Sequence, residues 1–568
     1  MILPRRPFLQ FVICALLAAG APGGCQSPTG SQNVQITLLG TTDLHGNLYP
    51  MDYYSNQPAN RGLAKIATLI RQVRAEQPNL LLLDSGDTIQ GTPLAFYYAR
   101  KDTSSTNPTV AVMNALGYDA MATGNHEFNF GLDVLLKAKS ESRFPWLAAN
   151  IAGPNSGNQH FQPYIIKEVA GVKVGIVGFI TPGVPRWEIP AHYRGYAFKP
   201  IVETAQQVIP EVRKKVDLLV VIAHSGLERD PQTGDTRGID QIQGENAVWA
   251  LAEQVPGIDV ILYGHSHREM PQLTVNGVLL AQARNWGQSL ARADVTLQRD
   301  AGGKWRVASK KSSTIPVTDA VPPDAEILAL ARPYHQATQA YLDTPVTTSG
   351  ASLSAETARY EDHPFVDLIH RAQMKYAKAD VSMATMFLTS ANIPAGPVTV
   401  RQLASLYIYE NTLYTVELTG AQIAEVLEQA ASFYPAWPVP EGQRLRLPGY
   451  SADCAQGVEY EIDLTQPTGQ RVRNLARHGQ PLDPAAKFRV AVNNYRYAGG
   501  GFYKTYQNLP ILYRSPQEVR ELLIEYVTRT GTFPTTADNN WKILPHAAVQ
   551  AMIREATQPR QSPAAGNQ

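Results

Sequence analysis

The sequence predicts a two-domain α/β protein, and three observations support this prediction. The chain has 568 residues, too many for one ordinary core, and its 44% hydrophobic content is typical of a globular protein. In the first half, short apolar runs alternate with helical patterns, which indicates a layered α/β domain with buried strands. A Pro-rich stretch around residues 313–323 and a helical pattern at 325–342 then separate this half from a second unit.

The N-terminal domain is expected to span residues 33–318. Apolar runs bounded by polar residues or glycine predict five of its strands, at residues 36–39, 80–83, 172–180, 218–223 and 260–263. Helical periodicity predicts helices at residues 63–74 and 246–254 between them. Residues 319–345 are expected to form a linker that contains the helix at 325–342.

The C-terminal domain is expected to span residues 346–556. Its helical patterns lie at residues 364–376 and 421–431, and its strand patterns at 414–418, 458–464 and 488–492. The last residues, 557–568, are polar and Pro-rich, which predicts a disordered tail.

The N-terminus has the pattern of an export signal. Arg5 and Arg6 precede an apolar stretch at residues 8–19 that is too short to span a bilayer comfortably. Cys25 is a candidate lipidated cysteine, whereas Ala19-Gly20-Ala21 offers a site for ordinary signal cleavage. Residues 1–32 are therefore expected to be a signal peptide and polar tether of an exported protein. Its expected location is the periplasm or cell envelope, with a lipid anchor at Cys25 as one alternative.

Charge and cysteine content limit the classes of partner and chemistry. Lys and Arg number 50 against 49 Asp and Glu, so the formal charge of +1 gives no reason to expect a polymeric nucleic-acid partner. The cysteines are Cys14, Cys25 and Cys454. With Cys14 in the signal and Cys25 lipidated or removed, no intramolecular disulfide is available. Cys454 is expected to be a packed thiol. The sequence gives no indication of the oligomeric state of the protein.

Five short polar motifs each follow an apolar segment. Alone, each has an ordinary interpretation as a turn or as a hydrogen-bonded histidine. Because the carboxyl ends of strands in an open α/β sheet meet at one edge, the motifs together predict a shared site. They are Asp43-Leu44-His45, Gly86-Asp87, Gly124-Asn125-His126-Glu127, Ala223-His224 and Gly264-His265-Ser266-His267.

These residue types suit a pair of divalent metal ions roughly 3.5–4 Å apart, which needs a bridging carboxylate and further N and O ligands. Asp87 is the candidate bridge. Imidazole and carboxylate ligands fit Zn, Mn, Fe or Co, so the metal is not specified. His126 is placed to bring positive charge near a leaving oxygen. The remaining candidates divide into one site of Asp43, His45 and His267, and another of Asn125, His224 and His265.

This set resembles the calcineurin-like metallophosphoesterase superfamily over residues 35–299. The sequences of residues 83–91 and 124–129 resemble those of the 5'-nucleotidase family, which belongs to this superfamily. The resemblance implies a four-layer α/β/β/α metallophosphoesterase domain, the metal ligands assigned above, and His126 as the catalytic histidine. Many members have Asp, paired with that histidine, where this chain has Asn129. The departure puts the electrostatic support of His126 in question, although not the metal site.

Two aromatic clusters occur in the second half, at residues 407–412 and 493–502. Composition alone indicates core or interface aromatics, although glycines allow close backbone approach and tyrosines offer flat faces for a base. Residues 346–556 resemble the nucleotide-binding domain of the 5'-nucleotidases. That resemblance implies a base clamp of Tyr409 and Tyr495, with Asn411, Gly499 and Gly500 also binding substrate.

One departure indicates the branch of the family. 5'-Nucleotidases carry a Gly-Gly-x-Arg segment that helps to bind the 5'-phosphate, and residues 389–394 lack that arginine. The chain instead resembles the 2',3'-cyclic-nucleotide 2'-phosphodiesterase/3'-nucleotidase branch, also in Asp52-Tyr53-Tyr54 and in residues 457–467. Hydrolysis of such nucleotides is the leading hypothesis. The alternatives are a 5'-nucleotidase or nucleotide-sugar hydrolase, and a non-catalytic surface protein that binds nucleotides.

Overall fold

The structure is a computed structural model that describes residues 33–153, 160–236, 243–443, 445, 447 and 449–557. The predicted signal peptide and tether at residues 1–32 lie outside the described residues. Thr557, the first residue of the predicted tail, is the last residue of helix α14 (His546–Thr557), and the rest of that tail is also outside them.

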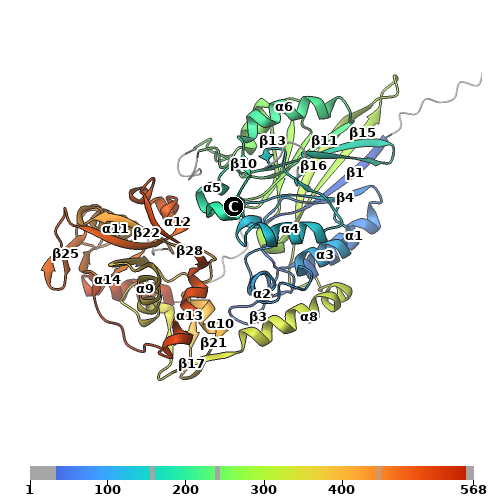
Figure 1. The fold of residues 1–568 in the computed structure, drawn as a ribbon. Helices are drawn as coiled ribbons and strands as arrows, with labels where there is room; N and C mark the ends of the chain where they lie inside the picture. The colour runs from blue at the N-terminus through green and yellow to red at the C-terminus, as the bar shows by residue number, and fades with distance from the viewer. Residues whose placement is uncertain are drawn as a thin grey trace, which may run out of the picture.

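Two six-stranded sheets form the centre of the N-terminal domain (Figure 1). The strand order of the first sheet is β16-β15-β1-β4-β5-β6, and that of the second is β13-β14-β12-β11-β9-β8. The first contains β1 (Asn33–Thr41), β4 (Leu80–Asp84), β5 (Ala120–Ala122), β6 (Trp146–Leu147), β15 (Ser289–Arg299) and β16 (Trp305–Pro316). The second contains β8 (Tyr164–Val169), β9 (Val172–Ile180), β11 (Leu218–His224), β12 (Val260–Tyr263), β13 (Met270–Val275) and β14 (Val278–Gln282).

The alternation of side chains along the strands explains how the sheets pack, because successive residues of a strand point to opposite faces. Leu38 and Ile176 belong to one buried cluster between the sheets. Their neighbours Leu39 and Val177 belong to two different clusters, each between a sheet and its covering helices. The predicted four-layer α/β/β/α domain is therefore confirmed.

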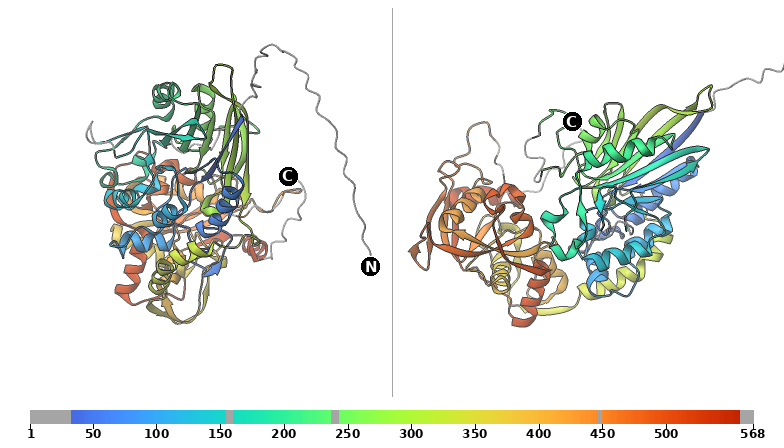
Figure 2. Two further views of the ribbon diagram at one scale, coloured as in Figure 1. Left: turned by 90° about the vertical axis from the view of Figure 1, so that its right-hand side faces the viewer. Right: turned by 45° about the horizontal axis from the view of Figure 1, so that its top comes forward.

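Helices cover both outer faces of this sandwich, as two further views show (Figure 2). Residues from α1, α3, α4 and α8 share a core with the first sheet, and residues from α6 and α7 share one with the second. The helices of the domain and linker are α1 (Leu63–Glu76), α2 (Pro93–Arg100), α3 (Pro108–Leu116), α4 (Leu132–Glu141), α5 (Val184–Trp187), α6 (Ile201–Arg213), α7 (Val248–Gln254) and α8 (Ala325–Leu342). Its short strands are β2 (Met51–Asp52), β3 (Gln57–Pro58), β7 (Ile151–Ala152) and β10 (Ala197–Phe198).

The linker helix α8 begins where the sequence predicts. The Asp324 side chain caps its first turn by accepting hydrogen bonds from the backbone N–H groups of Glu326 and Ile327. Its buried residues Ile327 and Ala331 pack into the helical layer of the N-terminal domain. The linker is thus fastened to the first domain before the chain enters the second.

The C-terminal domain is a second α/β unit with one hydrophobic core. A five-stranded sheet has the order β23-β19-β27-β22-β28, and a four-stranded sheet has the order β26-β25-β24-β29. These strands are β19 (Val381–Ala384), β22 (Thr412–Thr419), β23 (Cys454–Gln456), β24 (Glu459–Asp463), β25 (Val472–Arg477), β26 (Gln480–Pro481), β27 (Lys487–Asn493), β28 (Ile511–Glu518) and β29 (Trp541–Leu544). The helices are α9 (Pro364–Ala377), α10 (Val400–Leu406), α11 (Gly420–Ala431), α12 (Asn494–Tyr497), α13 (Val519–Thr530) and α14. Two strand pairs complete it, β17 (Pro345–Ser349) with β21 (Gly396–Thr399) and β18 (Leu353–Ser354) with β20 (Asn392–Ile393).

A buried polar network joins the two domains. The guanidinium of Arg520 pairs with Glu410 at 2.7 Å and donates to the Tyr54 hydroxyl at 2.8 Å. The side chains of Arg520 and Glu410 are only 3% and 1% exposed, so the charges are mutually neutralised out of water. Tyr54 in turn donates to the Ile408 carbonyl. Side chains of the C-terminal domain therefore contact the loops after β1 directly.

Cys454 has a partner that the sequence did not indicate. Its Sγ atom lies 3.6 Å from Nε2 of His370, although no sequence pattern suggested a Cys-His pair. Burial raises the pKa of the thiol and lowers the pKa of His370 to about 3. Both groups are therefore neutral, which agrees with the expected packed thiol and not with a nucleophile. Within the described residues, no helix has the length and apolar character that membrane crossing requires.

Candidate metal centre

The five predicted motifs meet at the carboxyl ends of the central strands. β1, β4 and β5 run parallel in the first sheet, and β9, β11 and β12 run parallel in the second. The loops that follow them therefore open at the same edge. Two groups of side chains form there, each with ligand atoms within 4.8 Å of one another. They are Asp43, His45 and His267, and Asp87, His224 and His265.

The first group presents two histidine nitrogens to each other. Nε2 of His45 lies 3.0 Å from Nε2 of His267, which lies 3.5 Å from Oδ1 of Asp43. Nδ1 of His45 faces the Gln90 carbonyl at 3.1 Å; a carbonyl only accepts, so this nitrogen carries the proton. Burial and then His267 lower the pKa of His45 to about 4. Its Nε2 therefore offers a lone pair, as a metal ligand must.

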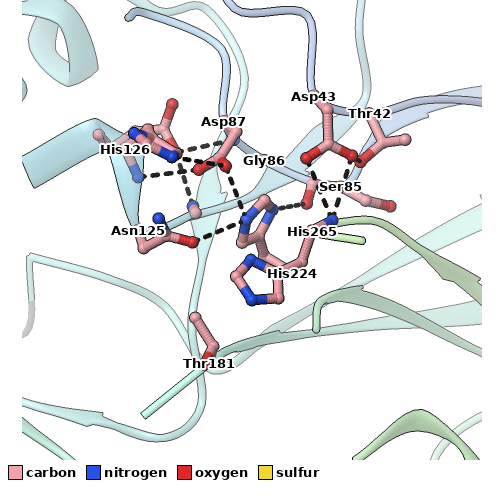
Figure 3. Close-up of polar contacts among 12 residues, drawn as sticks. Thr42, Asp43, Ser85, Gly86, Asp87, Asn125, His126, Thr181, His224 and His265 are labelled. Atoms are coloured by element: carbon pink, nitrogen blue, oxygen red, sulfur yellow. Dashed lines mark hydrogen bonds and ion pairs between the residues drawn. The ribbon is translucent and has the colours of Figure 1, made fainter. Parts of the chain in front are cut away.

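The second group places acceptor atoms around one buried nitrogen (Figure 3). His224 donates from Nδ1 to the Ser85 carbonyl at 2.8 Å. Its Nε2 then faces Oδ2 of Asp87 at 2.9 Å and Oδ1 of Asn125 at 3.1 Å. Burial alone would lower the pKa of His224, but the Asp87 carboxylate raises it to about 10. The Asp87 carboxylate therefore favours a positive charge at this position.

Asp87 lies where the two groups meet. Its Oδ2 atom is 2.9 Å from Nε2 of His224 in one group and 3.9 Å from Nε2 of His45 in the other. Carboxylate, imidazole and amide oxygen are together a donor set that suits a two-ion site, and Asp87 is the candidate for its shared carboxylate. The structure thus brings all seven predicted ligands together in the arrangement that the sequence predicts; their roles as ligands stay predictions.

The backbone of these loops is unusual. Five of the seven predicted ligands have a positive φ, although none is glycine: Asp43 (49°), His45 (47°), Asp87 (59°), His265 (71°) and His267 (56°). Such conformations cost about 1–3 kcal/mol each for most side chains and concentrate at functional sites. Gly86 and Gly124 make room for them, since a Cβ on Gly124 would lie 2.3 Å from Oδ1 of Asp87. The strained backbone at these five residues orients their side chains toward the predicted metal site.

Two buried carboxylates hold the site and were not assigned a role from the sequence. Glu127 accepts hydrogen bonds from the backbone N–H groups of Asp87 at 3.0 Å and Gly124 at 2.6 Å. Its signal was its place in the Gly-Asn-His-Glu motif. Glu245 lies 2.9 Å from Nε2 of His265 and so orients that ring. No local sequence pattern marks Glu245.

His126 lies beside the metal groups and not within them. Its backbone N–H donates to Oδ1 of Asp87 at 2.8 Å, and its Nε2 lies 3.9 Å from Oδ2 of Asp87. Its Nδ1 lies 2.5 Å from Oδ1 of Asn129. The two predicted catalytic residues are therefore in contact, even though Asn129 carries no charge.

A cavity of about 430 Å³ opens over the metal groups and is lined by both domains. From the N-terminal domain it includes His45, Asn125, His126, Asn129, His265 and His267 of the predicted site, with Trp187 and Trp286. From the C-terminal domain it includes the predicted substrate-binding residues Tyr409, Asn411 and Tyr495. A molecule in this cavity contacts the metal side and the aromatic side together.

The two predicted clamp residues differ in how they are supported. Tyr409 is 44% exposed and packs edge-on against Phe387, with ring centroids 4.9 Å apart. Tyr495 is contacted by the Arg496 guanidinium, 5.5 Å from its ring centroid. Asp453 holds Arg496 through two hydrogen bonds of 2.9 Å. Phe387 and Asp453 are supports that sequence reasoning missed.

Gly499 and Gly500, which are predicted to bind substrate, lie against other side chains of the C-terminal domain, and their role toward a substrate stays a prediction. Neither is among the described residues that line the cavity. A Cβ on Gly500 would lie 2.4 Å from Cε1 of Tyr495, and one on Gly499 would lie 2.2 Å from Nε2 of Gln507. These glycines therefore leave space for neighbouring side chains, Gly500 for Tyr495 and Gly499 for Gln507.

Comparison with known proteins agrees with this geometry. Residues 36–269 match the family described as calcineurin-like phosphoesterase, and residues 328–508 match the 5'-nucleotidase C-terminal domain. A 5'-nucleotidase precursor structure from Thermus thermophilus covers 90% of this chain and 99% of its own, at 26% identity and a TM-score of 0.61. A putative 5'-nucleotidase from Staphylococcus aureus, solved with alpha-ketoglutarate, covers 90% of this chain and 100% of its own, at 28% identity and a TM-score of 0.76.

Curated relatives extend the similarity along the chain. The Haemophilus influenzae 2',3'-cyclic-nucleotide 2'-phosphodiesterase/3'-nucleotidase is 33% identical over 95% of this chain and 92% of its own length. The Vibrio cholerae 5'-nucleotidase is 28% identical over 87% of this chain and 90% of its own. With this coverage and both domains matched, the chain belongs to the calcineurin-like metallophosphoesterases that carry a 5'-nucleotidase C-terminal domain, a family of hydrolases with a dinuclear metal site.

Proposed function

We propose that the protein hydrolyses 2',3'-cyclic nucleotides to 3'-nucleotides, and 3'-nucleotides to nucleoside and phosphate. The observation that carries this proposal is the shared cavity, in which the predicted metal ligands of one domain face Tyr409 and Tyr495 of the other. Relatives from Haemophilus influenzae and Salmonella typhimurium that bear this name are each 33% identical over at least 94% of the chain.

In this proposal the residues of the chain divide the work by position. Tyr409 and Tyr495 stack on the base and hold the nucleotide, so that binding energy far from the phosphate is used for positioning. Seven ligands would hold two ions, with Zn, Mn, Co and Fe as the candidates. Bound divalent ions polarise a phosphoryl oxygen and lower the pKa of water from about 15.7 toward 7. His126 lies beside them, placed to assist the leaving oxygen.

The cavity lining favours this substrate class over 5'-nucleotides. Among the described residues that line the cavity, those from the C-terminal domain include no arginine. The arginine that does line it, Arg61, lies in the N-terminal domain, where it pairs with Asp52 at 3.4 Å and covers Trp286. A 5'-nucleotidase would be expected to bind the 5'-phosphate through an arginine of the C-terminal domain. The described lining residues include no such arginine.

A substrate panel tests the proposal. Purified protein loaded with Mn, Co or Zn should release adenosine and phosphate from 2',3'-cyclic AMP and from 3'-AMP, with 3'-AMP as the intermediate product. 5'-AMP should be a poorer substrate in kcat/KM under the same conditions. A higher kcat/KM for 5'-AMP than for 3'-AMP would overturn the assignment in favour of a 5'-nucleotidase.

Removal of either clamp tyrosine should weaken nucleotide hydrolysis selectively. Tyr409→Ala and Tyr495→Ala are each expected to reduce kcat/KM for 3'-AMP by about 1–3 kcal/mol, the typical value of one base–aromatic stack. Bis-p-nitrophenyl phosphate has no base and should lose much less activity. The measurement is the ratio of the two losses in one preparation.

The matched control for these variants is Tyr164→Ala, because Tyr164 lies on β8 and contacts Lys215, away from the cavity. The Tyr164→Ala variant should have the wild-type kcat/KM for both substrates. Equal losses on both substrates in the Tyr409 and Tyr495 variants would show that these tyrosines serve the fold only.

We also propose that the chain is exported and anchored through Cys25. The support is the signal-like pattern of residues 1–24 and the cysteine that follows it. Cys25→Ala is expected to move the protein from the membrane fraction to the soluble fraction of fractionated cells. Wild-type protein that is already soluble and begins near Ala21 or Pro22 would contradict anchoring and leave the enzymatic proposal intact.

A further inference from the structure

The buried carboxylate of Glu188 is hydrogen-bonded to Asn129, one member of the predicted catalytic pair. Asn129 meets His126 through its Oδ1 atom, and its Nδ2 atom donates to Oε1 of Glu188. Glu188 is 6% exposed, and the loop that carries it is 59 residues further along the chain than Asn129. The three side chains form a continuous hydrogen-bonded series along the wall of the cavity.

The chemistry of the groups fixes the direction of these hydrogen bonds. An ionised carboxylate only accepts, so the amide of Asn129 must turn its NH₂ group toward Glu188. Its carbonyl oxygen is then left facing His126, and an oxygen can only accept from Nδ1–H. Glu188 therefore selects one orientation of Asn129, and Asn129 selects the His126 tautomer whose Nδ1 carries a proton. Nε2 of His126 is left on the side of Asp87, 3.9 Å from Oδ2.

Glu188 is itself held in place from two directions. Its Oε2 atom pairs with Nδ1 of His192 at 2.7 Å. The residue before it, Trp187, ends helix α5, and the Trp187 carbonyl accepts a hydrogen bond of 2.8 Å from Asn494 in α12. Helices α5 and α12 face each other across the domain boundary (Figure 1). The contact between the domains thus fixes the segment that presents Glu188.

We propose that Glu188 is a positioning residue for His126 and acts through the amide of Asn129. The proposal rests on the role of His126 in the hydrolysis proposed above. In related enzymes an Asp is expected to contact the catalytic histidine directly. In this chain the amide of Asn129 contacts His126, and the carboxylate of Glu188 is hydrogen-bonded to that amide. The negative charge that position 129 lacks is supplied by a residue in a distant loop.

A double-mutant cycle of wild type, Asn129→Asp, Glu188→Gln and the double variant tests this relay, because the coupling between two positions is obtained only when both single variants are measured. Asn129→Asp alone sets two carboxylates against each other and removes the donor to Glu188, so kcat for 3'-AMP should fall by about 10–100-fold, as is typical when a supporting partner is lost. Asn129→Asp combined with Glu188→Gln restores the pattern, because the new amide at position 188 donates to the new carboxylate at position 129, which accepts from His126. The double variant should recover to within about threefold of wild type, better than the Asn129→Asp variant, as coupling between contacting residues requires.

The leaving group supplies a readout that a purely structural defect would not move. Nucleoside alkoxide is a poor leaving group that needs His126, whereas p-nitrophenolate leaves without such help. The loss in the Asn129→Asp variant should therefore be large in kcat for 3'-AMP and small for p-nitrophenyl phosphate, with KM and metal content unchanged. Thermal unfolding of each variant shows whether the fold is intact.

Glu228→Gln is the matched control, because Glu228 is another carboxylate with short hydrogen bonds, accepting from the backbone N–H groups of Trp249 and Ala250, away from the cavity. It should behave as wild type. Additive losses in the double variant, or wild-type activity in Asn129→Asp, would overturn the relay while wild-type hydrolysis still stands. A wild-type protein inactive on every nucleotide would instead overturn the proposed function.

Discussion

Asp87→Asn is expected to lower kcat by orders of magnitude and to reduce the metal content of the protein. The substitution keeps the shape of the side chain and removes its charge. That charge is shared: Oδ2 of Asp87 lies 2.9 Å from Nε2 of His224 and 3.9 Å from Nε2 of His45, one in each ligand group. Oδ1 accepts from the backbone N–H of His126 at 2.8 Å. One neutralised carboxylate therefore weakens both ion positions together.

The measurement combines kcat on 3'-AMP with elemental analysis of metal per chain. Asp294→Asn on β15 is the matched control, because Asp294 also accepts a short hydrogen bond, 2.7 Å from the Thr37 hydroxyl, and lies outside the cavity. It should keep both activity and metal. An Asp87→Asn protein with near-normal kcat and two bound ions would end the two-metal assignment.

The predicted metal ligands could be located from the sequence because each lies at the carboxyl end of a buried strand or a few residues beyond it. Asp43 follows β1, Asp87 follows β4 and His265 follows β12, so apolar runs in the sequence locate them. Parallel strands then bring their carboxyl ends to one edge without further information. The site could be predicted only from the five motifs taken together and in order, because each motif alone has an ordinary interpretation as a turn or a hydrogen-bonded histidine.

The supports of the site were not predictable in the same way. Glu245 orients His265, and Glu188 orients Asn129, but each lies far along the segment that follows its strand, β11 or β9, and belongs to no short motif or repeated spacing. Their roles exist only after distant segments pack together. The positive φ angles of Asp43 and His45 are equally hidden, because non-glycine residues rarely adopt them and no residue type signals them.

The C-terminal site shows a third case, in which one residue type is compatible with two roles. Tyr409 and Tyr495 line the cavity, where the resemblance to the 5'-nucleotidase family led us to expect them. Gly500 is predicted to bind substrate, and its missing side chain also makes space for the Tyr495 ring. The sequence could not indicate this second role, because it arises only when the ring packs against the glycine.

His126→Ala is the second substitution with a large expected effect, and it separates catalysis from metal binding. His126 lies outside both ligand groups, and its Nε2 atom is 3.9 Å from Oδ2 of Asp87. Its backbone N–H, which the substitution keeps, makes the hydrogen bond to Asp87. The variant should therefore retain its metal. It should lose about 10²–10⁴-fold in kcat on 3'-AMP, the usual contribution of a positioned acid or base.

The substrate dependence of that loss identifies what His126 does. If its imidazole assists the leaving oxygen, the loss should be greatest for 3'-AMP, where a nucleoside leaves, and smallest for p-nitrophenyl phosphate. His478→Ala, at an exposed histidine of the C-terminal domain outside the cavity, is the control and should change neither. Loss of a metal ion from His126→Ala would make His126 a ligand. Equal losses on both substrates would assign it to binding the phosphoryl group, because only an interaction with the leaving oxygen depends on how readily that oxygen departs.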